Sequence, residues 1–524
     1  MSNARLTEIA VERFKSHGAE TRVGLSPLTV LVGPNNGGKS TIVQALLLLQ
    51  QTLHFPRVEV PLHLAGAVDA NSLRELTYDW PTGEDFIGPR FQIHWASDVE
   101  TESVLEEIGD GPFSVAAERI GGDWLRQFSA ESIFSTATSI SLQFSQISGK
   151  LSLTHIELAA YANQAVAPRL IFEFKLLDDG AYEVSCNGEA GKSIKVNLDH
   201  FIPYISINTR NIGPRDRQRA WVNAFKAVFL QPLDDLQGIL RNLNYLSSTR
   251  DIQPAIYRSA SIAPEGVGVS GELAAQLLHA SQDKSVLYNP PSSAALHEIP
   301  TPVISTLQVA VGNVLRELGI SAPLSIQKIG DLGFRLLFGN ATLQHVGRGL
   351  TYLLPIVEMG LIGDPTLFSA KDRQLTFKRA NFSVCAFEEP EAHLHPKLQA
   401  MLADWFVALA NGKRQVIVET HSDHLVRRLR SLIAQASPDS PMESWLRCHV
   451  SIVEVEQVGG ISKVAVSHLQ KNGDLETWPK DFMGQAQLME EVIYVAGLGK
   501  DDDAEGQLPE VAHSSEDEPY ERPD

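Results

Sequence analysis

Residues 33–41 read Gly-Pro-Asn-Asn-Gly-Gly-Lys-Ser-Thr, and this stretch decides the fold. It fits the pattern G-x-x-x-x-G-K-[S/T] and lies between an apolar run, 28–32, and a stretch with the composition of a core-facing helix, 41–53. Glycines let backbone N–H groups curl around a phosphate, and the N-terminus of the next helix adds the positive end of its dipole. The sequence therefore predicts a strand, a phosphate-binding loop and a helix in this order.

The residues of this loop have distinct expected roles. Lys39 supplies a point charge to the β- and γ-phosphates of a nucleotide, and Ser40 supplies a hydroxyl ligand to Mg²⁺. Further contacts to ATP are expected from the neighbouring residues Asn35, Asn36, Gly37, Gly38 and Thr41. The alternative is a glycine turn with a solvated lysine, although average residue usage produces this pattern by chance on the order of once in a hundred such chains.

A phosphate loop of this kind needs an acidic pair at the end of a buried strand. Residues 384–391, Val-Cys-Ala-Phe-Glu-Glu-Pro-Glu, supply such a pair after four apolar residues. Adjacent carboxylates are costly to bury unless a cation or a water lies between them. Glu388 is expected to hold the Mg²⁺ shell, and Glu389 is the candidate general base that orients water on the γ-phosphate. The alternative is a solvated acidic loop.

A third element follows the next apolar run, in residues 416–422, Val-Ile-Val-Glu-Thr-His-Ser. His421 at the carboxyl end of a strand can reach a γ-phosphate oxygen as a hydrogen-bond donor. The alternative is a histidine that caps the helix starting near Asp423. Reading His393, His395, His421 and His424 as zinc ligands is disfavoured, because these segments are already explained by nucleotide chemistry and no cysteine joins them.

Strands alternate with helices at both ends of the chain, and other material separates them. Short period-two strands separated by turns between residues 90 and 198 indicate an antiparallel sheet, and helical patterns dominate from 218 to 318. The expected fold is α/β: a P-loop NTPase head with an antiparallel β lobe, split by a mostly helical insertion. The expected divisions are 1–200 and 341–497 for the two parts of the head, 201–340 for the insertion and 498–524 for an acidic disordered tail.

Three motifs together carry a resemblance: Gly-Pro-Asn-Asn-Gly-Gly-Lys-Ser-Thr at 33–41, Glu-Glu-Pro-Glu-Ala-His-Leu-His-Pro at 388–396 and Glu-Thr-His-Ser at 419–422. The sequence resembles the ABC-type AAA ATPases of the OLD group, and within it the ATPases that carry a DUF3696 domain. Weaker stretches at 245–250 and 478–482 resemble the same subgroup. The TOPRIM nuclease often fused to OLD-type heads is not expected here, because the acidic constellation that it needs is absent after Ser422.

The resemblance implies an ABC/SMC-like head that dimerises, or forms a higher oligomer, by sandwiching ATP between two copies. Each copy offers a signature loop to the other's γ-phosphate, and the corresponding residues here are Gly347, Arg348 and Gly349. Where a serine usually faces the phosphate, Arg348 stands. Our hypothesis is that it acts in trans as an arginine finger. The alternative is an ordinary surface arginine at the start of a helix.

Composition excludes several other classes of protein. No apolar run approaches the ~20 residues of a membrane span, no signal peptide is evident, and three separated cysteines make neither a disulfide framework nor a cysteine-based zinc site. These features favour the cytoplasm. Residues 501–524 contain ten acidic residues and one basic residue, Arg522, and so carry −9 of the net charge of −19. The remaining 500 residues are only mildly acidic, so a basic patch there remains an option.

Three functions compete at this stage. The first is an ATP-driven dimerising switch that controls a separate effector, such as a nuclease or toxin, and the resemblance implies prokaryotic anti-phage defence as its setting. The second is a repair or recombination ATPase that binds DNA through arginine clusters, namely Arg210, Arg215, Arg217 and Arg219, or Arg427, Arg428 and Arg430. The third is a scaffold that binds ATP with little hydrolysis.

Overall fold

The computed structural model describes residues 4–100, 133–161, 167–191, 193–207, 217–251, 254–259, 262–291, 298, 300–330, 333–362, 383–412 and 414–477. The expected acidic tail, 498–524, and the stretch at 478–482 lie outside these described residues. None of the described helices is both long and apolar enough to cross a membrane.

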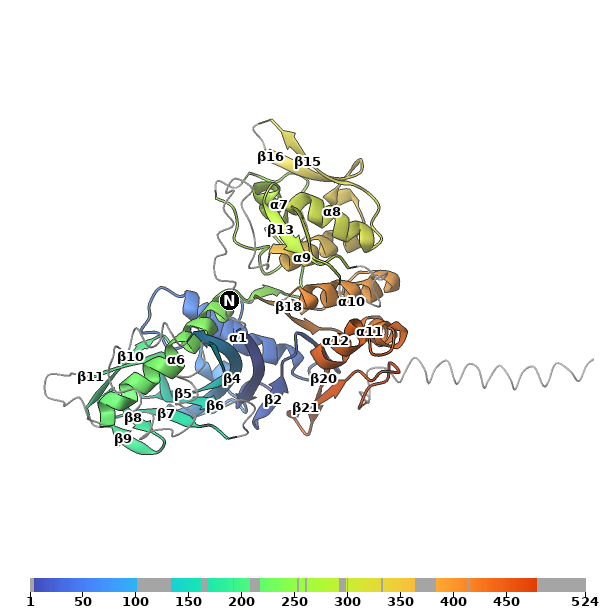
Figure 1. Cartoon of the computed structure of the whole chain (residues 1–524). Coiled ribbons are helices and arrows are strands. Elements are labelled where there is room, and N and C mark those ends of the chain that lie inside the picture. Colours follow the sequence, from blue (N-terminus) through green and yellow to red (C-terminus); the bar gives the residue numbers. More distant parts are fainter. Residues whose placement is uncertain are drawn as a thin grey trace, which may run out of the picture. The chain divides into compact units, whose positions relative to one another are not determined.

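One sheet joins strands from the two ends of the chain, as Figure 1 shows. Its strand order is β12-β18-β19-β3-β20-β21, and all neighbours are parallel except the β20–β21 hairpin. The strands are β3 (Leu28–Val32), β12 (Asn244–Leu246), β18 (Val384–Glu388), β19 (Gln415–Glu419), β20 (Val450–Val458) and β21 (Ile461–His468). Every residue of β3, β18 and β19 is buried, as expected for central strands of a parallel sheet covered on both faces.

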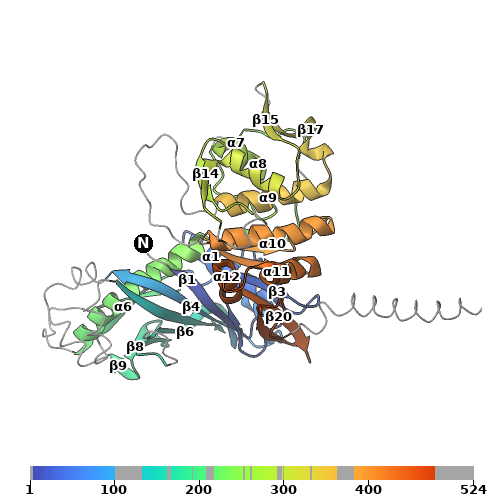
Figure 2. The same ribbon diagram turned by 45° about the vertical axis from the view of Figure 1, so that its right-hand side comes forward.

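Helices follow the strands of this sheet in α/β fashion. They are α1 (Lys39–His54), α10 (Pro396–Asn411), α11 (Asp423–Gln435) and α12 (Pro441–His449). α10 and α11 run side by side (Figure 2), and α10 packs on β19. Proline at the first position of α10 fits there because that residue needs no N–H partner, and His395 accepts a hydrogen bond from Lys397 as the helix cap.

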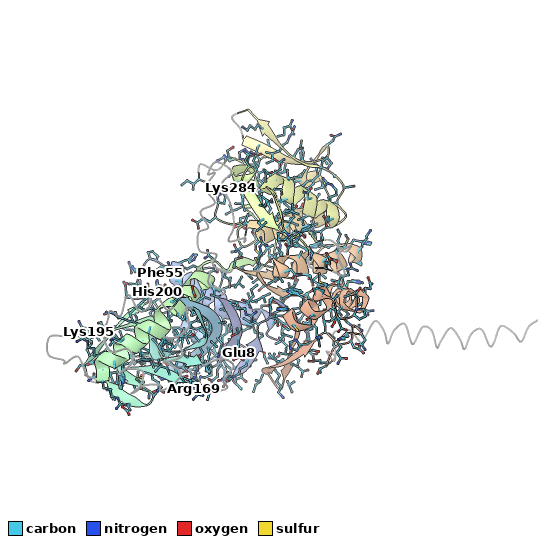
Figure 3. All side chains as sticks on the ribbon, viewed as in Figure 1. Glu8, Phe55, Arg169, Lys195, His200 and Lys284 are labelled. Atoms are coloured by element: carbon cyan, nitrogen blue, oxygen red, sulfur yellow. The ribbon has the colours of Figure 1, made fainter. Side chains whose placement is uncertain are left out.

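A second, antiparallel sheet has the order β2-β1-β4-β5-β6-β7-β8-β9. Its strands are β1 (Arg5–Glu12), β2 (Thr21–Gly24), β4 (Phe86–Glu100), β5 (Ile133–Ile147), β6 (Lys150–Tyr161), β7 (Leu170–Leu176), β8 (Tyr182–Cys186) and β9 (Glu189–Gly191). The hairpin of β10 (Ile194–Asp199) and β11 (Ile202–Ile207) and the short helix α2 (Leu73–Leu76) accompany it. Phe55 and His200, labelled in Figure 3, lie where the segment after α1 meets that hairpin: the His200 backbone N–H donates to the Val58 carbonyl at 2.8 Å.

Helix α6 (Arg217–Arg241) packs against both this sheet and α1. Its Phe225 and Phe229 rings meet Phe172 of β7 edge-on, with centroids 5.4 and 5.9 Å apart. The indole N–H of Trp95 donates to the carbonyl of Pro232 at 2.9 Å. These contacts make α6 part of the core of the antiparallel lobe, although it falls within the range expected for the insertion.

The remaining elements form a mixed lobe between α6 and β18. They are α7 (Ala274–Ser281), β13 (Ser285–Tyr288), β14 (Val303–Thr306), α8 (Leu307–Glu317), β15 (Leu324–Ile329), β16 (Gly333–Phe338), β17 (Ala341–Thr342), the 3-10 turn η2 (Leu343–His345) and α9 (Arg348–Ile362). α7, α8 and β13 pack against α9.

The α/β class with an antiparallel lobe is confirmed, and two details differ from expectation. The helical pattern expected over 218–318 is interrupted near its end, because Val303–Thr306 pairs with β13 as strand β14 before α8 begins. Two β-branched residues after Pro302 favour the extended backbone there. Strands also accompany the helices of 201–340, and one of them, β12, belongs to the sheet of the head.

Candidate functional site

The glycine-rich segment forms a loop between β3 and α1, as the sequence predicts. Gly33 and Gly38 have φ angles of 135° and 99°, and Asn36 has 63°. Glycine reaches such values without a Cβ penalty, and asparagine tolerates the left-handed region better than most residues. The loop is also tight, because a Cβ on Gly33 would lie 2.2 Å from the carbonyl oxygen of Val455.

Side chains from β21 and from the turn after β1 brace this loop from outside. The Ser462 hydroxyl donates to the carbonyl of Gly37 at 2.7 Å and bonds to the Ser16 hydroxyl at 2.9 Å. A ring nitrogen of His17 lies 3.1 Å from the carbonyl of Gly38. Burial lowers the pKa of His17, so the ring is neutral near pH 7 and donates this bond. These side chains hold the loop by its carbonyl groups. Within the loop, the Gly37 N–H donates to the Pro34 carbonyl at 3.2 Å, and the other N–H groups can face an anion.

Lys39 spans the loop and faces the acidic ends of β18 and β19. Its ammonium group donates to the carbonyls of Gly33 at 3.1 Å and Pro34 at 2.8 Å. Burial lowers the pKa of Lys39, and the carboxylates of Glu419, Glu389 and Glu391 oppose that shift, with Glu419 contributing most. The lysine thus lies among carboxylates that follow it by more than three hundred positions in the sequence.

Strand register explains this convergence. Glu388 pairs with Glu419 across β18 and β19, and Glu419 pairs with Leu31 of β3, two residues before the loop. Carboxyl ends of parallel neighbours meet at one edge of the sheet, the usual location of ligands in open α/β folds. The Ser40 hydroxyl donates to Glu419 at 2.8 Å, which ties the start of α1 to the end of β19.

Glu388 and Glu419 form a pair of buried, mutually repelling carboxylates. Burial raises the pKa of Glu419 to about 7, and Glu388 adds to the shift, against the opposing hydrogen bond from Ser40 and the charge of Lys39. Burial also raises the pKa of Glu388, against hydrogen bonds from the Tyr245 hydroxyl and the Ser248 backbone. One oxygen of each carboxylate has no hydrogen-bond partner among the described residues.

Such a site suits a divalent cation. A hydroxyl and two buried carboxylates with free oxygen atoms match the hard oxygen ligands that Mg²⁺ takes, since that ion is usually held by one or two carboxylates plus water and substrate phosphates. Ser40, Glu388 and Glu419 are the residues that would hold it. Among the residues that the structure describes, no group of three or more His, Cys, Asp or Glu side chains has the geometry to hold a metal by itself.

Glu389 and His421 lie together beside this carboxylate pair. The His421 Nε2 atom is 3.8 Å from a Glu389 carboxylate oxygen, and both side chains are partly exposed, by 33% and 43%. Burial and the Lys39 charge lower the pKa of His421, so its ring is largely neutral near pH 7 and keeps one N–H donor. Glu389 has a φ of 41°, which is strained for a residue with a Cβ.

Glu391 links the two loops that carry these residues. One carboxylate oxygen accepts a hydrogen bond from the backbone N–H of His421 at 2.7 Å, and the Thr420 hydroxyl also bonds to the carboxylate. Burial raises the pKa of Glu391 despite these bonds. The glutamate therefore fixes the histidine loop to the end of β18.

The residues of the expected signature loop, 347–349, lie at the start of α9. Among the described residues, no hydrogen bond or ion pair joins Gly347, Arg348 or Gly349 to the glycine loop at 35–41. A Cβ on Gly349 would lie 3.3 Å from the carbonyl oxygen of His393, and the Tyr352 ring stacks on His393 with centroids 5.0 Å apart. The start of α9 thus contacts the segment that follows the acidic pair.

Sequence reasoning missed several residues of this site. Glu419, Glu391, Tyr245 and Arg250 received no role, although Glu419 ends a buried strand just as Glu388 does. Lys15 was missed as well: its ammonium group donates to Gln44 at 2.6 Å, and Glu388 opposes the lowering of its pKa by burial. A glutamate that directly ends an apolar run, as Glu388 does, is the signal that could have revealed Glu419.

The predicted arginine clusters are largely neutralised where the structure describes them. Arg217 pairs with Glu189 and lies over the Trp221 ring. In α11, each arginine has an acidic partner: Arg427 with Asp423, Arg428 with Asp404 and Arg430 with Asp474. Arg210 and Arg215 lie outside the described residues. Arg219 lies in α6, and no acidic partner is found for it among the described residues. The pairings weaken the case for a phosphate-backbone grip mainly at the α11 cluster.

Comparison with known proteins gives one family match. The model of the AAA ATPase domain matches residues 5–104 and 366–426, the two segments that contain the glycine loop and the carboxylates. The chain is similar to AAA ATPases. No curated protein matches the sequence.

Several solved structures are similar over most of the chain. An Smc head bound to the C-winged helix domain of ScpA is 14% identical, with a TM-score of 0.36 over 89% of this chain and 98% of that one. An Smc head with an extended coiled coil, bound to the C-terminal domain of ScpA derived from Pyrococcus furiosus, is 14% identical, with a TM-score of 0.36 over 94% of this chain and 100% of that one. The SMC head domain from Thermotoga maritima is 10% identical, with a TM-score of 0.31 over 88% of this chain and 98% of that one.

Proposed function

We propose that this chain binds ATP with Mg²⁺ and hydrolyses it. One observation carries the proposal: Ser40 at the start of α1 donates to Glu419 at 2.8 Å, while Lys39 lies among Glu419, Glu389 and Glu391. A lysine and a hydroxyl at a helix N-terminus, facing buried carboxylates at the ends of parallel strands, form the constellation that holds and cleaves a nucleoside triphosphate.

Each side chain has a role in this chemistry. Lys39 and the N–H groups of residues 35–41 bind the β- and γ-phosphates, and His421 donates a hydrogen bond to the γ-phosphate. Glu389 accepts the proton of a water that attacks the γ-phosphorus, while the bond from phosphorus to the β–γ bridging oxygen breaks and ADP leaves. Ser40, Glu388 and Glu419 would hold Mg²⁺, which would supply positive charge to the phosphate oxygens.

Exposure supports the division of roles between the paired glutamates. Glu388 is buried, which suits a residue that holds a cation, and Glu389 is 43% exposed, which suits one that takes a proton from water. Removing a general base typically costs 10²- to 10⁴-fold in rate, so Glu389→Gln should slow ATP turnover by roughly this factor. ATP binding should stay within about 3-fold of wild type, since the phosphate contacts remain.

The control for this test is Glu183→Gln, a change of the same chemistry at an exposed position of β8. It should alter neither binding nor turnover. Radioactive phosphate release measures the rate, and titration calorimetry measures the affinity. A wild-type chain that binds no ATP would refute the proposed function, and equal turnover by wild type and Glu389→Gln would refute the role of Glu389.

We further propose that two copies sandwich ATP and that Arg348, with Gly347 and Gly349, reaches the γ-phosphate of the partner copy. Gly347 lies just before α9, and Arg348 and Gly349 begin that helix. Among the described residues, none of the three bonds to the chain's own glycine loop, which supports a role in trans. Moving a two-state switch from 1:99 to 99:1 needs roughly 5.5 kcal/mol of differential affinity, which phosphate contacts from two subunits can supply.

A mixing experiment tests this arrangement. Lys39→Ala and Arg348→Ala should each be inactive alone, but a mixed dimer contains one site with an intact Lys39 from one chain and an intact Arg348 from the other. An equimolar mixture should therefore recover about a quarter of wild-type turnover, because about half the dimers are mixed and each has one of two sites intact. No recovery would show that Arg348 does not act in trans.

We propose that this switch controls a separate effector protein, such as a nuclease or toxin, in the anti-phage setting that the OLD-like, DUF3696-type resemblance implies. A hydrolysis-blocked switch should retain its effector only while ATP is bound. The test is isolation of tagged Glu389→Gln from its native host with and without ATP. A partner retained equally in both conditions, or none in either, would contradict nucleotide gating.

A further inference from the structure

Arg250 lies at the carboxyl end of β12, beside the strand that carries the acidic pair. Leu246 of β12 pairs with Phe387 of β18, so the segment after β12 leaves the sheet next to Glu388. Arg250 is buried, with 7% of its surface exposed. Arginine is rarely buried unless its guanidinium is paired or hydrogen-bonded, because removing the charge from water costs free energy.

The guanidinium holds the peptide bond between the two glutamates. Its Nη2 atom donates to the carbonyl oxygen of Glu388 at 3.2 Å. The N–H of the same peptide belongs to Glu389 and donates to the carbonyl of Glu419 at 2.8 Å. The two polar groups of one peptide plane are thus fixed from opposite sides, by Arg250 and by β19.

This peptide determines where the carboxylate of Glu389 points. The φ torsion of Glu389 is a rotation about the bond that follows the peptide nitrogen, and its value of 41° is in the left-handed region. A non-glycine residue there carries on the order of 1–3 kcal/mol of strain, which persists only where the surroundings over-determine the geometry. Losing the hydrogen bond on one side of the plane would let Glu389 relax toward an ordinary φ and carry its side chain away.

The rest of the guanidinium has charged and polar neighbours but few bonds. Its Nε and Nη1 atoms have no hydrogen-bond partner among the residues that the structure describes. Burial lowers the pKa of Arg250 to about 10, against Tyr245, Glu388, Tyr352 and Glu389, so the group stays cationic near pH 7. A cation near both glutamates also reduces their repulsion.

We propose that Arg250 is a positioning residue that acts on hydrolysis through Glu389, by holding the Glu388–Glu389 peptide from the side opposite to β19. This inference rests on the proposed function and extends it by assigning a role in cis to a residue outside the glycine loop and both acidic loops. It differs from the proposed role of Arg348, which acts from the partner copy on the phosphate itself.

The test is a double-mutant cycle between Arg250→Met and Glu389→Gln in the full chain. Methionine keeps a long apolar stem but has no donor. Arg250→Met alone should lower kcat by about 10- to 100-fold with KM and ATP affinity within about 3-fold. In the Glu389→Gln background it should change the rate less than 2-fold, because residues that act as a unit are not additive.

A conservative variant and a matched control complete the experiment. Arg250→Lys retains a charged donor and should fall between wild type and Arg250→Met in kcat. Arg316→Met, at an exposed position of α8, should behave as wild type. Thermal unfolding of each variant identifies one that fails to fold, in which case Arg250→Lys provides the cycle.

The outcomes separate this inference from the function on which it rests. Multiplicative losses in the double variant, or a rise in KM equal to the loss in kcat/KM, would show that Arg250 acts on the phosphate and not through Glu389, and would overturn the inference. Unchanged kcat in Arg250→Met would overturn it too, with the proposed function intact. Absence of turnover in the wild-type chain would overturn both.

Discussion

Gly38→Ala should disable the phosphate loop with little effect on the rest of the fold. Gly38 has a φ of 99°, and an alanine Cβ there would lie 2.5 Å from Ser462 Oγ, 2.6 Å from Ser16 Oγ and 2.9 Å from a ring nitrogen of His17. The backbone conformation alone costs an alanine about 1–3 kcal/mol. Each of these contacts is closer than a real Cβ tolerates, so the side chains of Ser462, Ser16 and His17 must also move.

The movement has its own cost. Rotating Ser462 away breaks its hydrogen bonds to the Gly37 carbonyl at 2.7 Å and to Ser16 at 2.9 Å. At about 1 kcal/mol for each bond, the total reaches roughly 3–5 kcal/mol. These side chains hold the loop in the shape that binds phosphate. We therefore expect the lost free energy to weaken the affinity for ATP by at least about 100-fold.

Titration calorimetry with ATP and Mg²⁺ measures this effect, and Gly24→Ala is the matched control. Gly24 ends β2 with no atom within 4 Å of the added Cβ, so its variant should bind ATP as wild type does. Adding Ser462→Ala to Gly38→Ala removes the nearest overlap but not the backbone strain, and should give an intermediate affinity. If Gly38→Ala bound ATP within about 3-fold of wild type, the idea that these side chains hold the loop in its phosphate-binding shape would be refuted.

Three further predictions concern stability. Glu358 of α9 is fully buried, no described residue bonds to its carboxyl group, and burial raises its pKa well above the ordinary 4.5. The folded state therefore binds the proton more tightly than the unfolded state. Stability should fall by about 1.4 kcal/mol per pH unit as the pH rises from 4.5 toward the raised pKa, and thermal unfolding of Glu358→Gln should lack this loss; parallel pH curves would contradict it. Gly360→Ala should lower the free energy of unfolding by about 1–3 kcal/mol, because its Cβ would lie 2.7 Å from Trp405 and 2.8 Å from Leu409. The control is Gly312→Ala in α8, where the added Cβ meets open space; it should raise the free energy of unfolding by up to about 1 kcal/mol in urea titrations. Glu391→Ala should lower the melting temperature by several degrees more than Glu391→Gln, since only alanine leaves the His421 N–H without an acceptor.

The sequence predicts the parts of this fold that have strong local signals. β3, β18 and β19 are short, mostly apolar runs, each followed by a chemically distinctive loop, and the structure has them within two residues of expectation. The glycines and the asparagine of the loop also mark the turn that the structure shows. Lys39 and the downstream carboxylates converge because these runs pair in parallel, an arrangement that alternating strands and helices already favour.

Features that depend on long-range pairing could not be predicted in this way. β12 is a strand of three residues with no period of its own, and only its pairing with β18 makes Arg250 part of the site. The bond between Ser40 and Glu419 likewise depends on register between segments far apart in the chain. The left-handed φ of Glu389 is not predicted by its residue type, and the hydrogen bonds on both sides of the preceding peptide come from segments far apart in the chain.

The placement of β3 in the sheet has a consequence for how the protein is made. Among the described strands, both neighbours of β3 come from residues 415 and beyond, and bonds between Leu6 and Gln415 span 409 residues. Translation at about 5–20 residues per second leaves an interval of roughly 20 to 80 s in which β3 has emerged from the ribosome without a neighbour on either edge. During that interval a strand with four apolar residues of five has two unpaired edges. This chain is therefore expected to depend on a chaperone at the ribosome more than proteins whose strands pair with sequence neighbours.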